Sequence, residues 1–373
     1  MFPPLILLAC AALVLLWLRT MDGAAKILAE RAGQPYDSNR SRWSQRLVVV
    51  LMLAVVTMLF VERNAPNDDA RTDAIANDAA PPPNDGLWHA PDTSLIPSLP
   101  NADLVLYGRQ LIANTAAFLG PQGSVGRRSN GMNCQNCHLD AGTRPWGNNY
   151  GSVASIYPKF RERSGTKESI LKRVNDCFER SLNGTALDSA SLEMRAIVSY
   201  ITWVGIGVTK GEKAAGSGLM ELAYLDRAAD PARGELVFLE KCITCHNPDG
   251  QGKLNTDGRT YVYPPLWGPN SYNHGAGLYR LSRIAGYVKA NMPQGATWDR
   301  PQLTDEQAWD VAAYVNSQAR PSKDLSKDWP NLAGKPVDQP FGPYTDTFPE
   351  AQHKYGPFGP IAEAQAAAKK KQR

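Results

Sequence analysis

Two short stretches decide the fold: CQNCH at residues 134–138 and CITCH at residues 242–246. Each follows the pattern Cys-x-x-Cys-His, the attachment signal for c-type haem. The two thiols bond to the haem, and the adjacent histidine ligates the iron from one side. We therefore predict two covalently bound haem c groups. The residues that hold them are Cys134, Cys137, His138, Cys242, Cys245 and His246.

Zinc sites and thioredoxin-type redox sites also use paired cysteines. Two pairs that share a zinc ion are usually separated by about 15–20 residues. Here the pairs begin at residues 134 and 242, much farther apart. A thioredoxin-type motif needs a strand–helix–strand context, which this sequence lacks. Repetition of the complete five-residue motif therefore favours haem.

Helical patterns surround both motifs. Residues 102–119 and 231–241 precede the motifs, while residues 191–208 and 305–317 close the two halves. Thr304 and Gln307 offer a capping box for the last of these helices. Because strand patterns are scarce, we predict an all-α fold of two tandem cytochrome c domains. Their predicted bounds are residues 101–215 and 216–325.

The N-terminal region predicts a membrane anchor. Residues 2–18 and 47–61 are uncharged runs, and the longer one spans roughly 25 Å as a helix, slightly less than a bilayer core of about 30 Å. The loop between them carries more basic than acidic residues, which places it in the cytoplasm. We expect residues 1–62 to form a transmembrane helical hairpin. A single signal-anchor or a cleaved signal around the second run is the alternative.

The remaining segments complete the organisation. Residues 63–100 are rich in Pro, Asp and Ala and predict an extended linker. Because c-type haem is attached outside the cytoplasm, we expect the haem domains on the periplasmic side of the inner membrane. Residues 326–373 are expected to wrap over the domains with little regular structure. The net charge of +4 is spread along the chain and does not indicate nucleic-acid binding.

Met292 is the candidate sixth ligand of the second haem. It lies in ANMP at residues 290–293, where the proline stiffens the loop. Ligation by His and Met raises the potential of a haem. Lys289 and His274 are weaker candidates, and Met292 could instead fill the core.

The first domain has no equivalent Met-Pro, but it has Cys177. Of the six cysteines, four belong to the haem motifs and Cys10 falls in the first apolar run, so Cys177 has no soluble partner for a disulfide. Arg173 and Arg180 lie four residues before and three residues after it, and positive charge favours the thiolate, which is a good iron ligand. An inert buried cysteine is the simpler interpretation. The arginines could also bind haem propionates or a dianionic substrate.

At this point the sequence resembles a known family, the dihaem thiosulfate dehydrogenases, over roughly residues 102–361. The resemblance rests on five stretches at residues 133–143, 177–184, 264–269, 291–293 and 353–358. It implies two cytochrome c domains with the active site at the first haem. It further implies His138 and Cys177 as ligands of the first iron, and His246 and Met292 as ligands of the second. Cys177 would be the reaction centre, with Arg163, Arg173 and Ser181 as substrate-site groups.

The implied activity is oxidation of two thiosulfate ions to tetrathionate, with tetrathionate reduction as the reverse reaction. Electrons would pass from haem I to haem II, and then to an acceptor cytochrome or to a membrane oxidase or quinone enzyme. The alternative is a non-catalytic dihaem electron-transfer subunit of a terminal oxidase or dehydrogenase complex. Such a carrier has no use for Cys177, so residues 177–184 discriminate between the two.

Overall fold

The structure is a computed structural model that describes residues 26–27, 30–33 and 85–371. The predicted hairpin and most of the predicted linker, including Cys10, lie outside these residues. Within the described residues, no helix combines the length and the apolar character needed to cross a bilayer. The chain divides into residues 1–79 and 80–373, and every element named below belongs to the second part.

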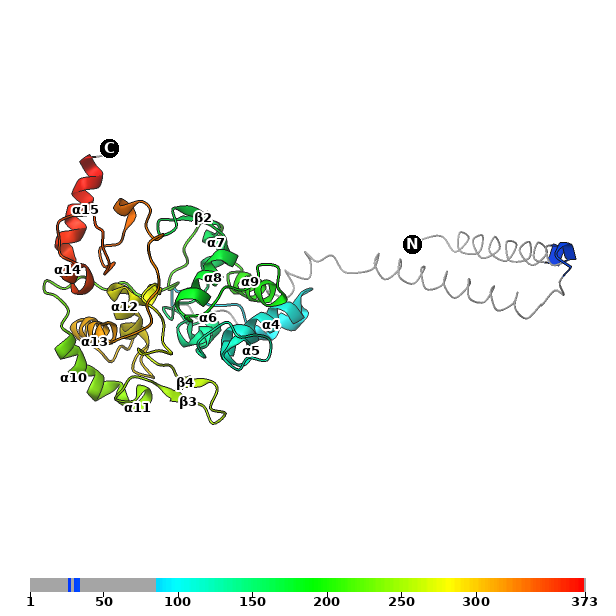
Figure 1. The fold of residues 1–373 in the computed structure, drawn as a ribbon, viewed down its shortest axis with the longest axis horizontal. Coiled ribbons are helices and arrows are strands. Elements are labelled where there is room, and N and C mark those ends of the chain that lie inside the picture. The colour runs from blue at the N-terminus through cyan, green and yellow to red at the C-terminus, as the bar shows by residue number, and fades with distance from the viewer. Residues whose placement is uncertain (1–25, 28–29, 34–84, 372–373) are drawn as a thin grey trace. The chain divides into compact units, whose positions relative to one another are not determined.

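Short helices form most of the first domain (Figure 1). Ser169 caps α8 by accepting a hydrogen bond from the backbone of Lys172, and Ser191 caps α9 in the same way from Met194. Strands β1 and β2 form a small antiparallel pair. The elements are η1 (Thr93–Ser98), α4 (Ala102–Ala113), α5 (Thr115–Leu119), η2 (Cys134–Asn136), α6 (Leu139–Gly142), α7 (Val153–Ile156), β1 (Lys159–Arg161), β2 (Thr166–Glu168), α8 (Ile170–Arg180) and α9 (Leu192–Val204).

The second domain repeats this plan. The predicted capping box of Thr304 and Gln307 is present and begins α13. A second antiparallel pair, β3 with β4, follows the haem motif. The elements are α10 (Pro231–Lys241), α11 (Ile243–His246), β3 (Lys253–Leu254), β4 (Tyr261–Tyr263), η3 (Gly277–Tyr279), α12 (Leu281–Asn291) and α13 (Asp305–Ser317).

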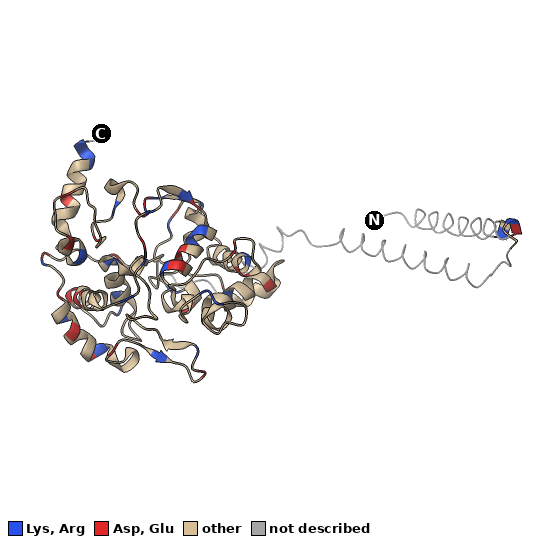
Figure 2. Ribbon diagram, viewed as in Figure 1, with Lys and Arg blue, Asp and Glu red and all other residues tan. Residues whose placement is uncertain are grey.

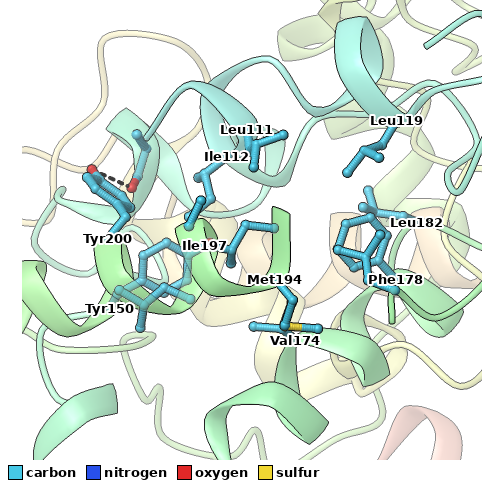
Figure 3. Packing of buried hydrophobic residues seen from close by; sticks show 14 of the residues in the cluster. Leu111, Ile112, Leu119, Tyr150, Val174, Phe178, Leu182, Met194, Ile197 and Tyr200 are labelled. Carbon is cyan, nitrogen blue, oxygen red and sulfur yellow. Dashed lines mark hydrogen bonds between the residues drawn. The ribbon is translucent and has the colours of Figure 1, made fainter. Parts of the chain in front are cut away.

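In each domain the first and last long helices cross at a glycine. A Cβ at Gly108 on α4 would collide with the backbone oxygen of Ala196 on α9, and a Cβ at Gly234 on α10 would collide with that of Asp310 on α13. The absence of a side chain therefore lets the helix backbones approach closely. Two separate apolar cores result, and Figure 3 shows the first, where Ile112 and Ile197 lie between the crossing helices.

The C-terminal segment differs from the expectation of little regular structure. It contains η4 (Leu332–Gly334), α14 (Glu350–Tyr355) and α15 (Gly359–Lys371). The prediction is wrong for the two α-helices. The reason for α15 is that residues 362–368 are rich in alanine, the strongest helix former. Phe358 and Ile361 are buried in the core of the second domain, and this burial adds to the stability of the helix.

The crossing glycines generate a prediction about stability. Gly108→Ala places a methyl group against the backbone of α9, so we expect a loss of about 1–3 kcal/mol of unfolding free energy. Gly126→Ala is the matched control, because its Cβ would find its nearest neighbour, Leu119, at 3.9 Å. Denaturant unfolding of the holoprotein measures both variants. Equal stabilities would show that the crossing tolerates a side chain.

Candidate functional site

Both motif histidines are fixed by backbone carbonyls. His138 Nδ1 lies 2.5 Å from the carbonyl oxygen of Asn148, and His246 Nδ1 lies 2.9 Å from that of Pro264. A carbonyl can only accept, so Nδ1 carries the proton in each ring. Nε2 is then the unprotonated nitrogen that can bind a metal.

Each histidine lines a cavity together with its two motif cysteines. The first cavity, of about 410 Å³, is lined by Cys134, Cys137 and His138. The second, of about 1010 Å³, is lined by Cys242, Cys245 and His246. None of the five described cysteines forms a disulfide. A covalently attached haem requires two thiols and an imidazole with a free nitrogen, all beside one cavity. The residues at both cavities therefore fit a haem.

Cys177 lies on the wall of the first cavity, on α8. Arg173, one helical turn earlier, donates a hydrogen bond from Nη1 to Cys177 Sγ at 3.1 Å. Burial raises the pKa of the thiol, but the positive charge of Arg173 outweighs this effect, and the pKa is lowered to about 7. The sequence-based expectation that Arg173 lies beside Cys177 is confirmed by this contact.

The other two predicted catalytic residues line the same cavity. Arg163 follows β1 and donates a hydrogen bond from Nη1 to the carbonyl of Gly275 at 2.6 Å. Burial and the nearby charge of Arg180 lower its pKa to about 10. Ser181 is the C-terminal cap of α8. The structure therefore brings Cys177, Arg163, Arg173 and Ser181 together.

Met292 lines the second cavity, directly after α12. The weaker candidates lie elsewhere: Lys289 donates to the carbonyl of Leu303 at 2.8 Å, and the His274 ring packs on Tyr279. In the first domain, Met194 is fully buried in the apolar core, where it packs near Val174 (Figure 3). Among the described residues, Cys177 and Met292 are therefore the candidate ligands that face the two cavities.

Sequence reasoning missed the contribution of the C-terminal segment. Asp328 accepts two hydrogen bonds from Arg180, both at 2.8 Å, and Trp329 lines the first cavity. The pairing spans 148 positions in the sequence, and no local pattern signals it. Arg180 thus serves an ion pair and not the thiol of Cys177.

Two family models match the chain. Residues 125–209 match the model described as "SoxA/TsdA, cytochrome c domain", and residues 231–319 match the model described as "Cytochrome c". The matched segments contain one haem motif each. The predicted architecture of two cytochrome c domains is therefore confirmed.

Curated relatives extend the similarity. The chain is 38% identical to "Thiosulfate dehydrogenase" from Psychrobacter arcticus, over 65% of this chain and 71% of the relative. It is 37% identical to the protein of that name from Allochromatium vinosum, over 65% of this chain and 87% of the relative. The chain is also 31% identical to the thiosulfate dehydrogenase from Stutzerimonas stutzeri, over 79% of this chain and 96% of the relative.

The chain belongs to the thiosulfate dehydrogenase family. A solved structure of "Thiosulfate dehydrogenase (TsdBA)" from Marichromatium purpuratum superposes with a TM-score of 0.58 at 32% identity. The match covers 64% of this chain and 50% of the other, so half of that longer chain has no counterpart here. With two cytochrome c domains and two attachment motifs, this thiosulfate dehydrogenase family member carries two covalently bound haem c groups.

The shared carboxylate beside the first cavity generates a prediction. Asp328 pairs with Arg180 and lies 3.9 Å from Arg163 Nε, and the three side chains are only 10–15% exposed. Asp328→Asn leaves two largely buried cations without their counter-ion, so we expect a loss of about 3–5 kcal/mol in denaturant unfolding. Asp226→Asn, at a position without a described ion pair, is the control. A loss below about 1 kcal/mol would contradict this account.

Proposed function

We propose that this chain oxidises two thiosulfate dianions to tetrathionate in the cavity that contains Cys177. One S–S bond forms between the terminal sulfurs of the two ions, and two electrons leave. The observation that carries the proposal is the Arg173–Cys177 contact at 3.1 Å, in a cavity that also contains His138. A thiol held by a cation, in the same cavity as a haem-binding histidine, suits sulfur chemistry and serves no purpose in a simple carrier.

The proposed iron ligands are His138 and Cys177 for the first haem, and His246 and Met292 for the second. When bound, the two haems supply acceptors for one electron each. The backbone carbonyls of Asn148 and Pro264 hold the two imidazoles in the tautomer that can ligate. Arg173 stabilises the thiolate form of Cys177, the form that binds iron.

Substrate binding is assigned to Arg163, Arg173 and Ser181. Thiosulfate is a dianion, and guanidinium groups bind such anions through paired, charge-assisted hydrogen bonds. No aspartate or glutamate is among the described residues that line this cavity. Ser181 offers a hydroxyl donor at the end of α8, which completes a site selective for an oxyanion.

We further propose that the catalytic part is anchored to the inner membrane through residues 1–62 and faces the periplasm, where it delivers electrons to a cytochrome or to a membrane oxidase or quinone enzyme. The support is the pair of uncharged runs with the basic loop between them. Membrane fractionation of the full chain, followed by protease treatment of spheroplasts, tests the location. Recovery of haem protein in the soluble fraction would refute the anchor.

The catalytic assignment predicts the outcome of a single substitution. Cys177→Ala should lower thiosulfate-dependent reduction of an artificial acceptor at least about 100-fold, because the reaction centre is lost. Ser164→Ala, a substitution just outside the cavity, is the control, and haem content verifies that both groups remain attached. Full activity in Cys177→Ala would refute the assignment. Absence of turnover in the unmodified holoprotein, in either direction, would favour an electron-transfer subunit.

A further inference from the structure

Positive charge lines the first cavity well beyond the residues assigned above. Figure 2 shows several basic positions on the ribbon around β2 and α8. Among the described residues, the cavity is lined by seven basic and no acidic side chains. The basic ones are Lys159, Arg161, Arg163, Arg173, Lys213, Arg280 and Arg283.

Some of these cations are already neutralised. Arg280 is held by the fully buried carboxylate of Asp338, with its Nε 2.8 Å from Oδ1. Arg161 Nε lies 3.8 Å from the buried carboxylate of Glu168. A cation paired with a buried carboxylate is not available to a second anion without losing that pair.

Lys159, Lys213 and Arg283 remain without comparable partners. Within residues 85–371, neither lysine lies in an ion pair, and the one ion pair of Arg283 is with Glu221, at 3.9 Å. The Glu221 side chain is 76% exposed, so water screens this pair. The three cations come from β1, from the segment after α9 and from α12, so only the tertiary fold brings them together.

The three side chains are close enough to influence one another. Burial lowers the pKa of Lys159, and the charges of Arg161, Lys213, Arg173 and Arg283 lower it further. Like charges that converge without an intervening carboxylate create a positive field that an anion relieves.

Lys159 is half-buried, but Lys213 and Arg283 lie farther out than Arg163. Lys213 is exposed, and the Arg283 side chain is 38% exposed, against 15% for Arg163. They therefore stand where the cavity opens to solvent.

We propose that Lys159, Lys213 and Arg283 form a second anion subsite at the mouth of the cavity, which holds the second thiosulfate dianion. The inference rests on the proposed function, because joining two thiosulfates requires both ions in the cavity at once. Two dianions repel each other four times as strongly as two single charges at the same distance. Arg163 and Arg173 hold the first ion near Cys177, and the mouth subsite offsets the repulsion on the second.

The test compares two double variants of the holoprotein. Lys159→Gln with Lys213→Gln removes two charges from the mouth subsite. Lys253→Gln with Lys369→Gln removes the same charge from exposed positions that do not line the cavity. Two quantities are measured for each: the thiosulfate dependence of turnover, and the Kd for sulfate, an unreactive dianion, by calorimetry.

The mouth variant should raise KM for thiosulfate and Kd for sulfate by about tenfold or more, with kcat changed less than about twofold. The exposed-site control should stay near the unmodified protein, and Lys159→Arg with Lys213→Arg should restore most of the affinity. Unchanged KM and Kd in the mouth variant, or equal losses in the control, would overturn the subsite while leaving the proposed function intact.

A different result separates the two proposals. If the unmodified protein binds sulfate but turns over neither thiosulfate nor tetrathionate, the proposed function fails. Loss of sulfate binding in the mouth variant would then still establish an anion site, and its assignment to a second thiosulfate would be refuted.

Discussion

The structure depends on the hydrogen bond that fixes each motif histidine. Nδ1 of His138 and of His246 is held by a backbone carbonyl, so Nε2 of each ring is left to ligate iron in its cavity. The motif cysteines lie on the same cavities, and the glycine-mediated helix crossings position the motif segments. The two domains therefore hold their motif histidines in the same way, and the other residues that line each cavity are what distinguish them.

The cavities differ in Cys177, which lines the first, and Met292, which lines the second, and these are the sixth ligands that we propose. A thiolate favours ferric iron, whereas methionine raises the potential, so the two sites suit different steps of one electron path. Met132, Cys137 and Leu278 line both cavities, which places the two sites on either side of a common wall. Among the described residues, the Cys177 cavity is lined by seven basic and no acidic side chains, whereas the second cavity is lined by both basic and acidic ones. Under the proposed function, substrate chemistry and onward electron transfer take place in two adjacent cavities.

Sequence alone could predict the haem motifs, the helical class and the proximity of Arg173 to Cys177, because each depends on short-range spacing. It also placed Met292 in a loop stiffened by Pro293, and in the structure Met292 directly follows α12. It could not predict the ion pair of Arg180 with Asp328 or the convergence of Lys159, Lys213 and Arg283, since these contacts join distant segments. Helix α15 was not predicted because the tail as a whole is rich in proline and glycine, which disfavour helices. The alanine-rich residues 362–368 favour a helix locally.

The central claim is that the two haems have the same histidine ligation and different sixth ligands. Electron paramagnetic resonance of the oxidised holoprotein tests it directly. We expect two distinct ferric signals, of which Cys177→Ala alters one and Met292→Ala alters the other. Two indistinguishable signals, or signals that neither substitution changes, would contradict this assignment of ligands.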